Sequence, residues 1–171
     1  MKNTTRDYRH IQFCEGHSKV DIPQLIALFN SAAIWAKNRK IEDLEIAIAN
    51  SSPVVSVWNN KTMIGFGRAT SDCVYRGTIW DIVIHPNYQG GGLGRKLVET
   101  ILSHPRMCHV ERVYLMTTYQ QNFYKRIGFQ QNQTTTMILH NQPIEGEIEL
   151  TTRNKHHYLP QKLNSHHPLY S

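Results

Sequence analysis

The chain of 171 residues has no long hydrophobic run and only three cysteines. No stretch approaches the roughly 18 consecutive apolar residues that a membrane-spanning helix requires, so we expect no membrane partner. The first residues, 1–7, contain no apolar segment of the signal-peptide kind, and we expect no secretory signal. Cys14, Cys73 and Cys108 are widely and irregularly spaced, which excludes a disulfide scaffold and suits reduced thiols in a cytosol or organelle matrix.

Acidic residues are missing from the last 22 residues, and this changes how the net charge of +6 is interpreted. Arg153, Lys155 and Lys162 supply half of that charge, whereas the preceding part of the chain carries 16 basic and 13 acidic side chains. A domain so nearly balanced has no electrostatic footprint for DNA or RNA, and we expect no nucleic-acid partner. We interpret residues 151–171 as a flexible, basic, histidine-rich tail that follows a single domain of residues 1–150.

The period of the hydrophobic pattern changes along the chain and predicts an α/β (α+β) fold. Helical spacing predicts helices over 21–34, 40–49, 92–104 and 119–127. A period of two predicts strands over 8–14, 54–58, 63–69, 78–84, 110–116, 135–139 and 144–150. The order of strand, two helices and then three strands favours a mixed sheet. Gly65 and Gly67 interrupt one strand, which indicates that something approaches its backbone closely.

The most informative stretch is the glycine-rich run of residues 89–96, which reads Gln-Gly-Gly-Gly-Leu-Gly-Arg-Lys between an expected strand and an expected helix. Glycines free backbone N–H groups to line a concave anion site, and the helix that follows adds unpaired N–H groups and the positive end of its dipole. A phosphate or pyrophosphate is the natural ligand, with Arg95 and Lys96 beside it. Leu97 stands where a dinucleotide fingerprint needs glycine, and no Walker-type Gly-Lys-Ser/Thr is present.

With these residues the sequence resembles the GCN5-related N-acetyltransferase (GNAT) superfamily. Gln89, Gly92 and Gly94 match its signature Gln/Arg-x-x-Gly-x-Gly/Ala, and residues 122–129 are similar to its Phe-Tyr-x-x-x-Gly-Phe helix end. The resemblance implies a single GNAT-fold domain. Its central sheet is mixed, mostly antiparallel and splayed at its middle, and about four helices flank it.

Two shorter strings resemble a narrower branch of that superfamily. They are Ala69-Thr70-Ser71-Asp72 and Thr78-Ile79-Trp80-Asp81, and they are similar to the cyanobacterial and plastid branch that includes plant chloroplast serotonin N-acetyltransferase. This resemblance implies a prokaryotic cytoplasm or a plastid stroma as the compartment. It leaves open whether the domain forms a homodimer.

The resemblance also implies a set of acetyl-CoA contacts. The glycine-rich loop would bind the pyrophosphate, and the backbone of the strand before it would pair with the pantetheine arm. Many family members carry Asn six residues before the Phe-Tyr pair; Thr117 stands there in this chain and offers a hydroxyl instead. The expected contacts are Ile82, Val83, Ile84, Gln89, Gly90, Gly91, Gly92, Leu93, Gly94, Arg95, Thr117 and Asn122.

Tyr124 is the expected general acid, because the family's tyrosine at this place points at the CoA sulfur. A phenol with a pKa of about 10 is protonated at pH 7 and can donate. We expect a backbone amide of the strand before the loop to hold the oxyanion. Two roles stay open for Asp81: the base that accepts the amine proton, or a structural partner for Arg68. His85 either titrates near neutrality or shapes the turn of a His-Pro pair.

These features predict an enzyme that transfers an acetyl group from acetyl-CoA directly to a primary amine. The acceptor is either an arylalkylamine such as serotonin or a protein lysine or N-terminus. Aromatic lining near Trp80 and Tyr75 would favour the first, and an open acidic groove the second. The alternative is a catalytically silent acetyl-CoA-binding sensor or interaction module. We expect no metal, since the histidine pairs at 156–157 and 166–167 have no cysteine or carboxylate nearby.

Overall fold

The computed structural model describes residues 8, 10–133 and 137–139. All of its helices and strands belong to the unit of residues 1–131, the first of two units into which the chain divides. Of the second unit, 132–171, the described residues are in no helix or strand. The functional features below therefore all come from the first unit.

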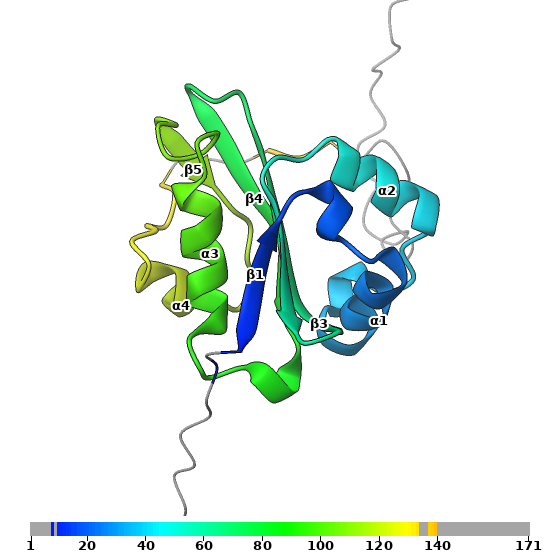
Figure 1. The fold of residues 1–171 in the computed structure, drawn as a ribbon. Helices are drawn as coiled ribbons and strands as arrows, with labels where there is room; N and C mark the ends of the chain where they lie inside the picture. The colour runs from blue at the N-terminus through cyan, green and yellow to red at the C-terminus, as the bar shows by residue number, and fades with distance from the viewer. Residues whose placement is uncertain (1–7, 9, 134–136, 140–171) are drawn as a thin grey trace, which may run out of the picture. The chain divides into compact units, whose positions relative to one another are not determined.

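The centre of the first unit is a five-stranded sheet in the order β1-β2-β3-β4-β5 (Figure 1). Its strands are β1 (Ile11–Glu15), β2 (Val54–Asn59), β3 (Thr62–Ser71), β4 (Arg76–Ile84) and β5 (Arg112–Tyr114). The first four strands pair antiparallel in succession, and β5 pairs parallel to β4. The mixed, mostly antiparallel sheet expected from the sequence is confirmed.

Helices cover both faces of this sheet. They are α1 (Ile22–Ala32), α2 (Ile41–Ala49), α3 (Leu93–Ser103) and α4 (Gln121–Lys125), with 3₁₀ turns η1 (His17–Lys19), η2 (Ile34–Ala36) and η3 (Pro86–Tyr88). α1 and α2 lie on one face of the sheet, and α3 and α4 lie on the other (Figure 1). Each pair closes a hydrophobic core of its own against the sheet.

α1 begins where the sequence predicts a helix start. The Asp21 carboxylate accepts a hydrogen bond from the backbone N–H of Gln24 at 3.0 Å and so caps the helix. Leu25 and Phe29, four residues apart, lie on the same helix face and are fully buried. The Phe29 ring meets the Phe66 ring of β3 edge to face, with centroids 5.9 Å apart. These contacts hold α1 on the sheet beside the end of β4.

Two elements near the end of the first unit are shorter than the sequence predicts. β5 has three residues instead of the expected 110–116, because only these three find a partner in β4. α4 has five residues instead of the expected 119–127. The helix ends at Lys125, before the expected Ile127, and a turn of residues 126–128 follows. Gly128 in this turn has φ +111°, and the Phe129 N–H donates to the Tyr124 carbonyl at 3.1 Å.

The expected strand at 135–139 is wrong for the part of it that is described. Its residues 137–139 are exposed and in no strand, since none of the described strands pairs with them. The expected strand at 144–150, the domain end at residue 150 and the tail of 151–171 lie outside the described residues.

β4 carries a bulge in its second half. Its pairing with β3 is regular up to Trp80 and resumes at Val83, so that Gly67 of β3 stands opposite two residues of β4. One of these, Asp81, has φ +54°, in the left-handed region. β5 pairs with β4 only as far as Thr78, because β5 ends at Tyr114, the partner of Thr78. The second half of β4, with the bulge, therefore has no ladder with β5.

The two glycines of β3 leave room for side chains of β4. A Cβ at Gly65 would lie 2.6 Å from Cδ1 of Ile84 and 3.0 Å from Cβ of Val57. A Cβ at Gly67 would lie 2.6 Å from Cδ1 of Ile82. The close approach expected at these glycines is therefore confirmed. It is made by the two isoleucines that precede the glycine-rich loop.

We expect Gly65→Ala to lower the free energy of unfolding by about 1–3 kcal/mol, because the new methyl group overlaps Ile84 and Val57 in a packed layer. Denaturant unfolding followed by circular dichroism measures this change. Gly94→Ala is the control, because a Cβ at Gly94 meets only ordinary contacts, 3.5 Å from Phe123 Cζ at the nearest. Equal midpoints for Gly65→Ala and the unmodified protein would contradict the packing described.

Candidate functional site

A cavity of about 510 Å³ lies beside the second half of β4, beyond Thr78, the last residue of β4 that pairs with β5. Its wall is built from the end of β4, the glycine-rich loop, the first turn of α3, α4, the end of α1 and η2. The lining residues are Ala32, Trp35, Ile82, Val83, Ile84, Gln89, Gly90, Gly92, Gly94, Arg95, Gln120, Phe123, Tyr124, Arg126 and Ile127.

Most of the residues expected to contact acetyl-CoA lie on this wall. Those that line the cavity are Ile82, Val83, Ile84, Gln89, Gly90, Gly92, Gly94 and Arg95. Four of the expected residues are not among the lining residues: Gly91, Leu93, Thr117 and Asn122. The end of β4 and the glycine-rich loop that follows it therefore line the same cavity.

The glycine-rich loop is shaped for a backbone-lined anion site. Gly90 and Gly92 have φ values of +82° and +84°, which favour glycine. Gln89 braces the loop against the strand, since its side-chain Nε2 donates to the Ile84 carbonyl at 2.8 Å. α3, with 11 residues, begins directly after Gly92, which has no side chain to cap it. The N–H groups of its first turn are therefore available to an anion, and the helix dipole favours negative charge there.

Gly91 and Leu93 support the loop from behind. A Cβ at Gly91 would overlap the ring of Tyr8, so the tyrosine lies directly against this glycine. The Tyr8 hydroxyl is buried without a hydrogen-bond partner in the part of the chain that the structure describes. Leu93 is 5% exposed and packs in the core under α3. Both residues therefore pack against other parts of the first unit, and neither lines the cavity.

Thr117 and Asn122 lie at the start of α4, away from the cavity wall. The Thr117 hydroxyl accepts a hydrogen bond from the backbone N–H of Gln120 at 3.1 Å and so holds the turn before the helix. Asn122 is exposed. The residue of this segment that does line the cavity is Gln120, which the sequence analysis did not single out as a contact.

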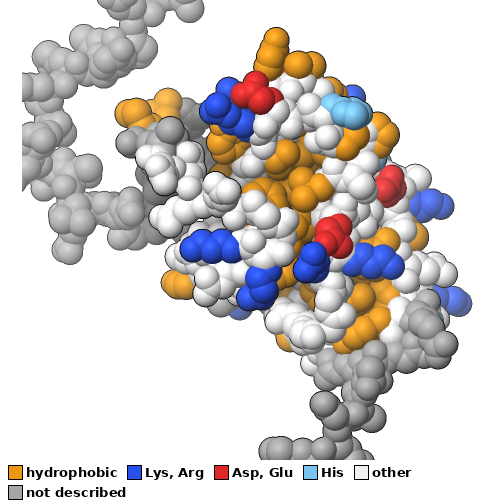
Figure 2. All heavy atoms as spheres, turned by 90° about the vertical axis from the view of Figure 1, so that its left-hand side faces the viewer, with side chains coloured by type: hydrophobic (Ala, Val, Ile, Leu, Met, Phe, Trp, Pro, Cys, Tyr) orange, Lys and Arg blue, Asp and Glu red, His pale blue; other side chains and the backbone are white. Residues whose placement is uncertain are grey.

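The charged residues on the cavity wall are both arginines. Arg95 lines the cavity from α3, and its Nε donates to Glu99 Oε1 at 2.7 Å. Arg126 lines it from the end of α4. Lys96, expected beside the phosphate, is not a lining residue. Its ammonium group lies over the Phe13 ring, 4.7 Å from the centroid. On the face that carries α3 and α4, basic side chains lie beside exposed hydrophobic ones (Figure 2).

Tyr124 lies on the cavity wall, as the acid role requires. Its ring meets the rings of Phe123 and Phe129 edge to face, with centroids 4.9 Å and 5.8 Å away. Burial among these groups raises the pKa of the Tyr124 phenol above its ordinary value of 10.0. The phenol therefore stays protonated throughout the neutral range and is able to donate a proton.

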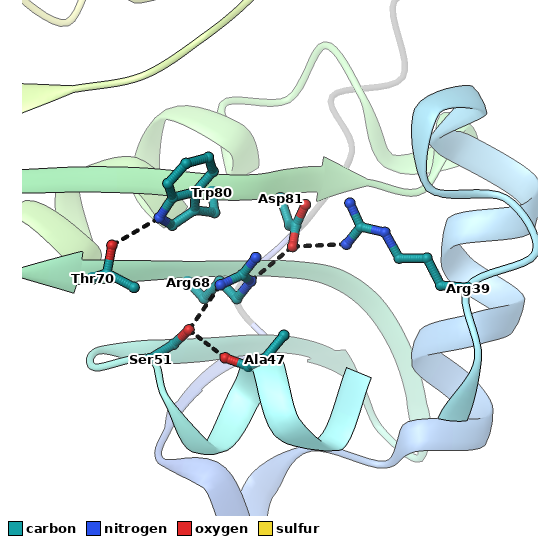
Figure 3. A network of polar contacts seen from close by, with 7 residues as sticks. All are labelled: Arg39, Ala47, Ser51, Arg68, Thr70, Trp80 and Asp81. Atoms are coloured by element: carbon teal, nitrogen blue, oxygen red, sulfur yellow. Dashed lines mark hydrogen bonds and ion pairs between the residues drawn. The ribbon is translucent and has the colours of Figure 1, made fainter. Parts of the chain in front are cut away.

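Asp81 is held in ion pairs beside the cavity and is not one of its lining residues (Figure 3). Its Oδ2 accepts hydrogen bonds from Arg68 Nε at 2.7 Å and from Arg39 Nη1 at 3.0 Å. The structural pairing with Arg68 that the sequence analysis considered is therefore present. His85 shapes its turn, since its Nδ1 accepts a hydrogen bond from the backbone N–H of Asn87 at 3.2 Å.

The tryptophan on the cavity wall is not the one that the sequence suggested. Trp80 donates from Nε1 to the Thr70 hydroxyl at 2.9 Å and is not a lining residue, and neither is Tyr75. Trp35 of η2 takes that place and is 64% exposed. Nothing in the sequence around Trp35 distinguishes it from a core tryptophan, because its place on the wall depends on contacts between segments that are far apart in the chain.

The described residues contain no group of three or more His, Cys, Asp or Glu side chains placed to hold a metal ion. No helix within residues 10–133 is both long enough and apolar enough to cross a bilayer.

Comparison with known proteins agrees with this geometry. The model of the Acetyltransferase (GNAT) family matches residues 22–129. The "Uncharacterized N-acetyltransferase ycf52" of Pyropia yezoensis is 33% identical over 122 residues, which are 68% of this chain and 69% of that protein. The "GCN5-related N-acetyltransferase 2, chloroplastic" of Arabidopsis thaliana is 39% identical over 71 residues, 41% of this chain and 28% of that protein.

Solved structures give the same fold. The acetyltransferase of the GNAT family from Streptococcus pneumoniae TIGR4 superimposes with a TM-score of 0.65 at 22% identity. The match covers 78% of this chain and 99% of that one. The glycine-rich loop that opens α3 and these matches show that the chain belongs to the GNAT family of acetyltransferases.

Proposed function

We propose that the protein is an acetyl-CoA-dependent N-acetyltransferase that moves the acetyl group directly from the thioester to a primary amine. One observation carries this proposal: a single cavity runs from the uncapped N-terminus of α3 to the buried phenol of Tyr124. The first end suits a pyrophosphate and the second suits a departing thiolate. Family membership supports the reaction class.

In this proposal the donor lies along the end of β4. The pyrophosphate accepts hydrogen bonds from backbone N–H groups at Gly90 to Gly94, with Arg95 and Arg126 as the nearby positive charges. The pantetheine arm follows Ile82 to Ile84, and a backbone amide of this strand holds the oxyanion. We assign no donor contact to Thr117 or Asn122, because neither lines the cavity.

The transfer step needs one general acid and one water molecule that accepts a proton. The neutral amine nitrogen attacks the thioester carbonyl, and a C–N bond forms while the C–S bond breaks. Tyr124 donates its proton to the departing thiolate, and water takes up the proton that the amine loses. We do not assign the amine proton to Asp81, because its Oδ2 already accepts from two arginines and could take a proton only by breaking an ion pair.

The acceptor end of the cavity favours one of the two acceptor classes. Ala32 and Trp35 form that end, and none of the lining residues is acidic. A flat aromatic wall suits a small arylalkylamine, whereas a lysine-rich peptide is usually recognised by carboxylates. We therefore propose a small arylalkylamine as the preferred acceptor. We also propose a plastid stroma or a prokaryotic cytoplasm as the compartment, which the chloroplastic relative supports.

Acetyl transfer to an arylalkylamine and to a lysine peptide, measured side by side with one enzyme preparation, tests the proposal. We expect turnover of the arylalkylamine and a fall in kcat of about 10²–10⁴-fold in Tyr124→Phe, because the thiolate loses its proton donor. Acetyl-CoA binding, measured by calorimetry, should be retained in that variant. Acetyl-CoA binding without transfer to either acceptor would support a silent sensor or interaction module instead.

The raised pKa of Tyr124 gives a pH prediction. Since the protonated phenol is the active form and burial raises its pKa, kcat should fall only as the pH rises above 10.0. Profiles of kcat against pH for the unmodified enzyme and for Tyr124→Phe check this, and the second should lack that alkaline limb. A limb with its midpoint well below pH 10 in both enzymes would rule out Tyr124 as its source.

The glycine-rich loop gives a binding prediction. Gly92→Ala should weaken acetyl-CoA binding by about tenfold, because a left-handed alanine costs about 1–2 kcal/mol and the loop relaxes away from its binding shape. A Cβ at Gly92 meets nothing within 4 Å, so no clash contributes. Calorimetric titration with acetyl-CoA measures the change.

Gly16→Ala is the matched control for this experiment. Gly16 has φ +105°, has nothing within 4 Å of a Cβ and is not a lining residue of the cavity. It should lower stability by at least as much, because its φ of 105° and ψ of 153° are essentially restricted to glycine, and it should leave acetyl-CoA affinity unchanged. Equal affinity losses in the two variants would assign the effect to general destabilisation.

A further inference from the structure

A buried carboxylate and two guanidinium groups form a cluster at the bulge of β4. Asp81, with a side chain 6% exposed, shares its Oδ2 between Arg68 at 2.7 Å and Arg39 at 3.0 Å (Figure 3). Burying a carboxylate is costly unless charged hydrogen-bond donors compensate for the lost water. The cluster is therefore held together by the charge that each arginine supplies.

The cluster sits where the backbone of β4 changes direction. Asp81 has φ +54°, a conformation that a side chain other than that of glycine adopts only when its surroundings hold it there. The next three residues, 82–84, are those of β4 that line the cavity. The ion pairs thus determine how this segment enters the cavity wall.

Arg39 connects this bulge to a second wall of the cavity. It follows η2, the turn that carries Trp35, and its guanidinium group lies 5.3 Å from the centroid of the Phe29 ring. Ala33 and Ala36 anchor the same segment by burial, each 1% exposed. Among the described contacts, the bond from Arg39 to Asp81 is the polar link between this segment and β4.

Arg68 extends the cluster to other elements. Its Nη1 donates to the Ser51 hydroxyl at 2.9 Å, and that hydroxyl donates to the Ala47 carbonyl of α2 at 2.6 Å. The Arg68 guanidinium group also lies 5.8 Å from the centroid of the Trp80 ring. We therefore expect the loss of the Arg39 donor to disturb the surroundings of Trp80, because Arg68 would be left as the described donor to the Asp81 carboxylate.

We propose that Arg39 is a positioning residue for acetyl transfer, which couples the acceptor wall at Trp35 to the thioester strand through the carboxylate of Asp81. The inference rests on the proposed function and adds to it the contact that fixes the two walls relative to each other. The relative position of acceptor and donor matters because small displacements of reacting atoms lower the rate steeply.

Kinetics of Arg39→Met test the proposal. Methionine keeps an apolar stem beside Phe29 and removes the donors to Asp81. We expect kcat/KM for the amine to fall by about tenfold to a hundredfold. Acetyl-CoA affinity should fall by a smaller factor than kcat/KM for the amine, because the glycine-rich loop that holds the pyrophosphate is untouched and only the strand beside the pantetheine arm is affected. Arg39→Lys, which keeps the charge, should recover part of the loss and covers the case in which Arg39→Met does not fold.

Arg112→Met is the matched control. Arg112 pairs with Glu111 at 3.3 Å on the surface, with a side chain 63% exposed, and contributes nothing to the cavity wall. We expect its kinetic constants to match those of the unmodified enzyme. A loss in Arg39→Met no larger than in Arg112→Met, or an equal loss of acetyl-CoA affinity and amine turnover, would overturn the proposal.

A spectroscopic measurement tests the coupling without any activity. The chain has three tryptophans, so 5-fluorotryptophan labelling gives three ¹⁹F resonances, assigned by single Trp→Phe variants. In Arg39→Met the Trp35 and Trp80 resonances should shift or broaden, whereas that of Trp58 should not. The spectrum of Arg112→Met should be unchanged.

The two measurements separate failure of this proposal from failure of the proposed function. An enzyme that acetylates neither amine overturns the function, and the ¹⁹F spectra then still decide the coupling. Unchanged Trp35 and Trp80 resonances in folded Arg39→Met would overturn the coupling, whether or not the enzyme is active. Shifts at both tryptophans together with a selective loss of amine turnover support it.

Discussion

The end of the ladder between β4 and β5 at Thr78 is the constraint on which the functional site depends. Up to that residue the two strands pair in parallel, and beyond it β4 passes through a left-handed residue, Asp81. Such a residue inside a strand is uncommon. It persists here because two guanidinium groups hold its carboxylate. The consequence is that Ile82 to Ile84 line a cavity instead of continuing the ladder with β5.

Packing on both faces of the sheet stabilises the end of β4. Ile84 and Ile82 pack in the core under α3, and Val83 packs in the core under α1 and α2. Gly65 and Gly67 of β3 make the arrangement fit, because larger residues would displace the isoleucine side chains. The segment that lines the cavity is therefore fixed from both sides by burial and at its start by ion pairs.

Much of the fold could be predicted because its signals are local. The Asp21 cap, the helical spacing of Leu25 and Phe29 and the period of two in the hairpin strands each act within a few residues. The limits of β5 and α4 could not be predicted in this way. They depend on where a distant strand stops pairing and on the turn that the Thr117 hydroxyl holds, and neither follows from periodicity.

The sequence by itself determined the glycine-rich loop and the helix that it opens, because backbone freedom and helix start are properties of residues 89–96 alone. Only the tertiary structure decided which side chains meet around it. Trp35 lines the same cavity as the end of β4, and Asp81 is paired rather than free because Arg68 and Arg39, 13 and 42 residues away, fold against it. Partners of a buried charge are chosen by distance in space, which spacing along a chain does not reveal.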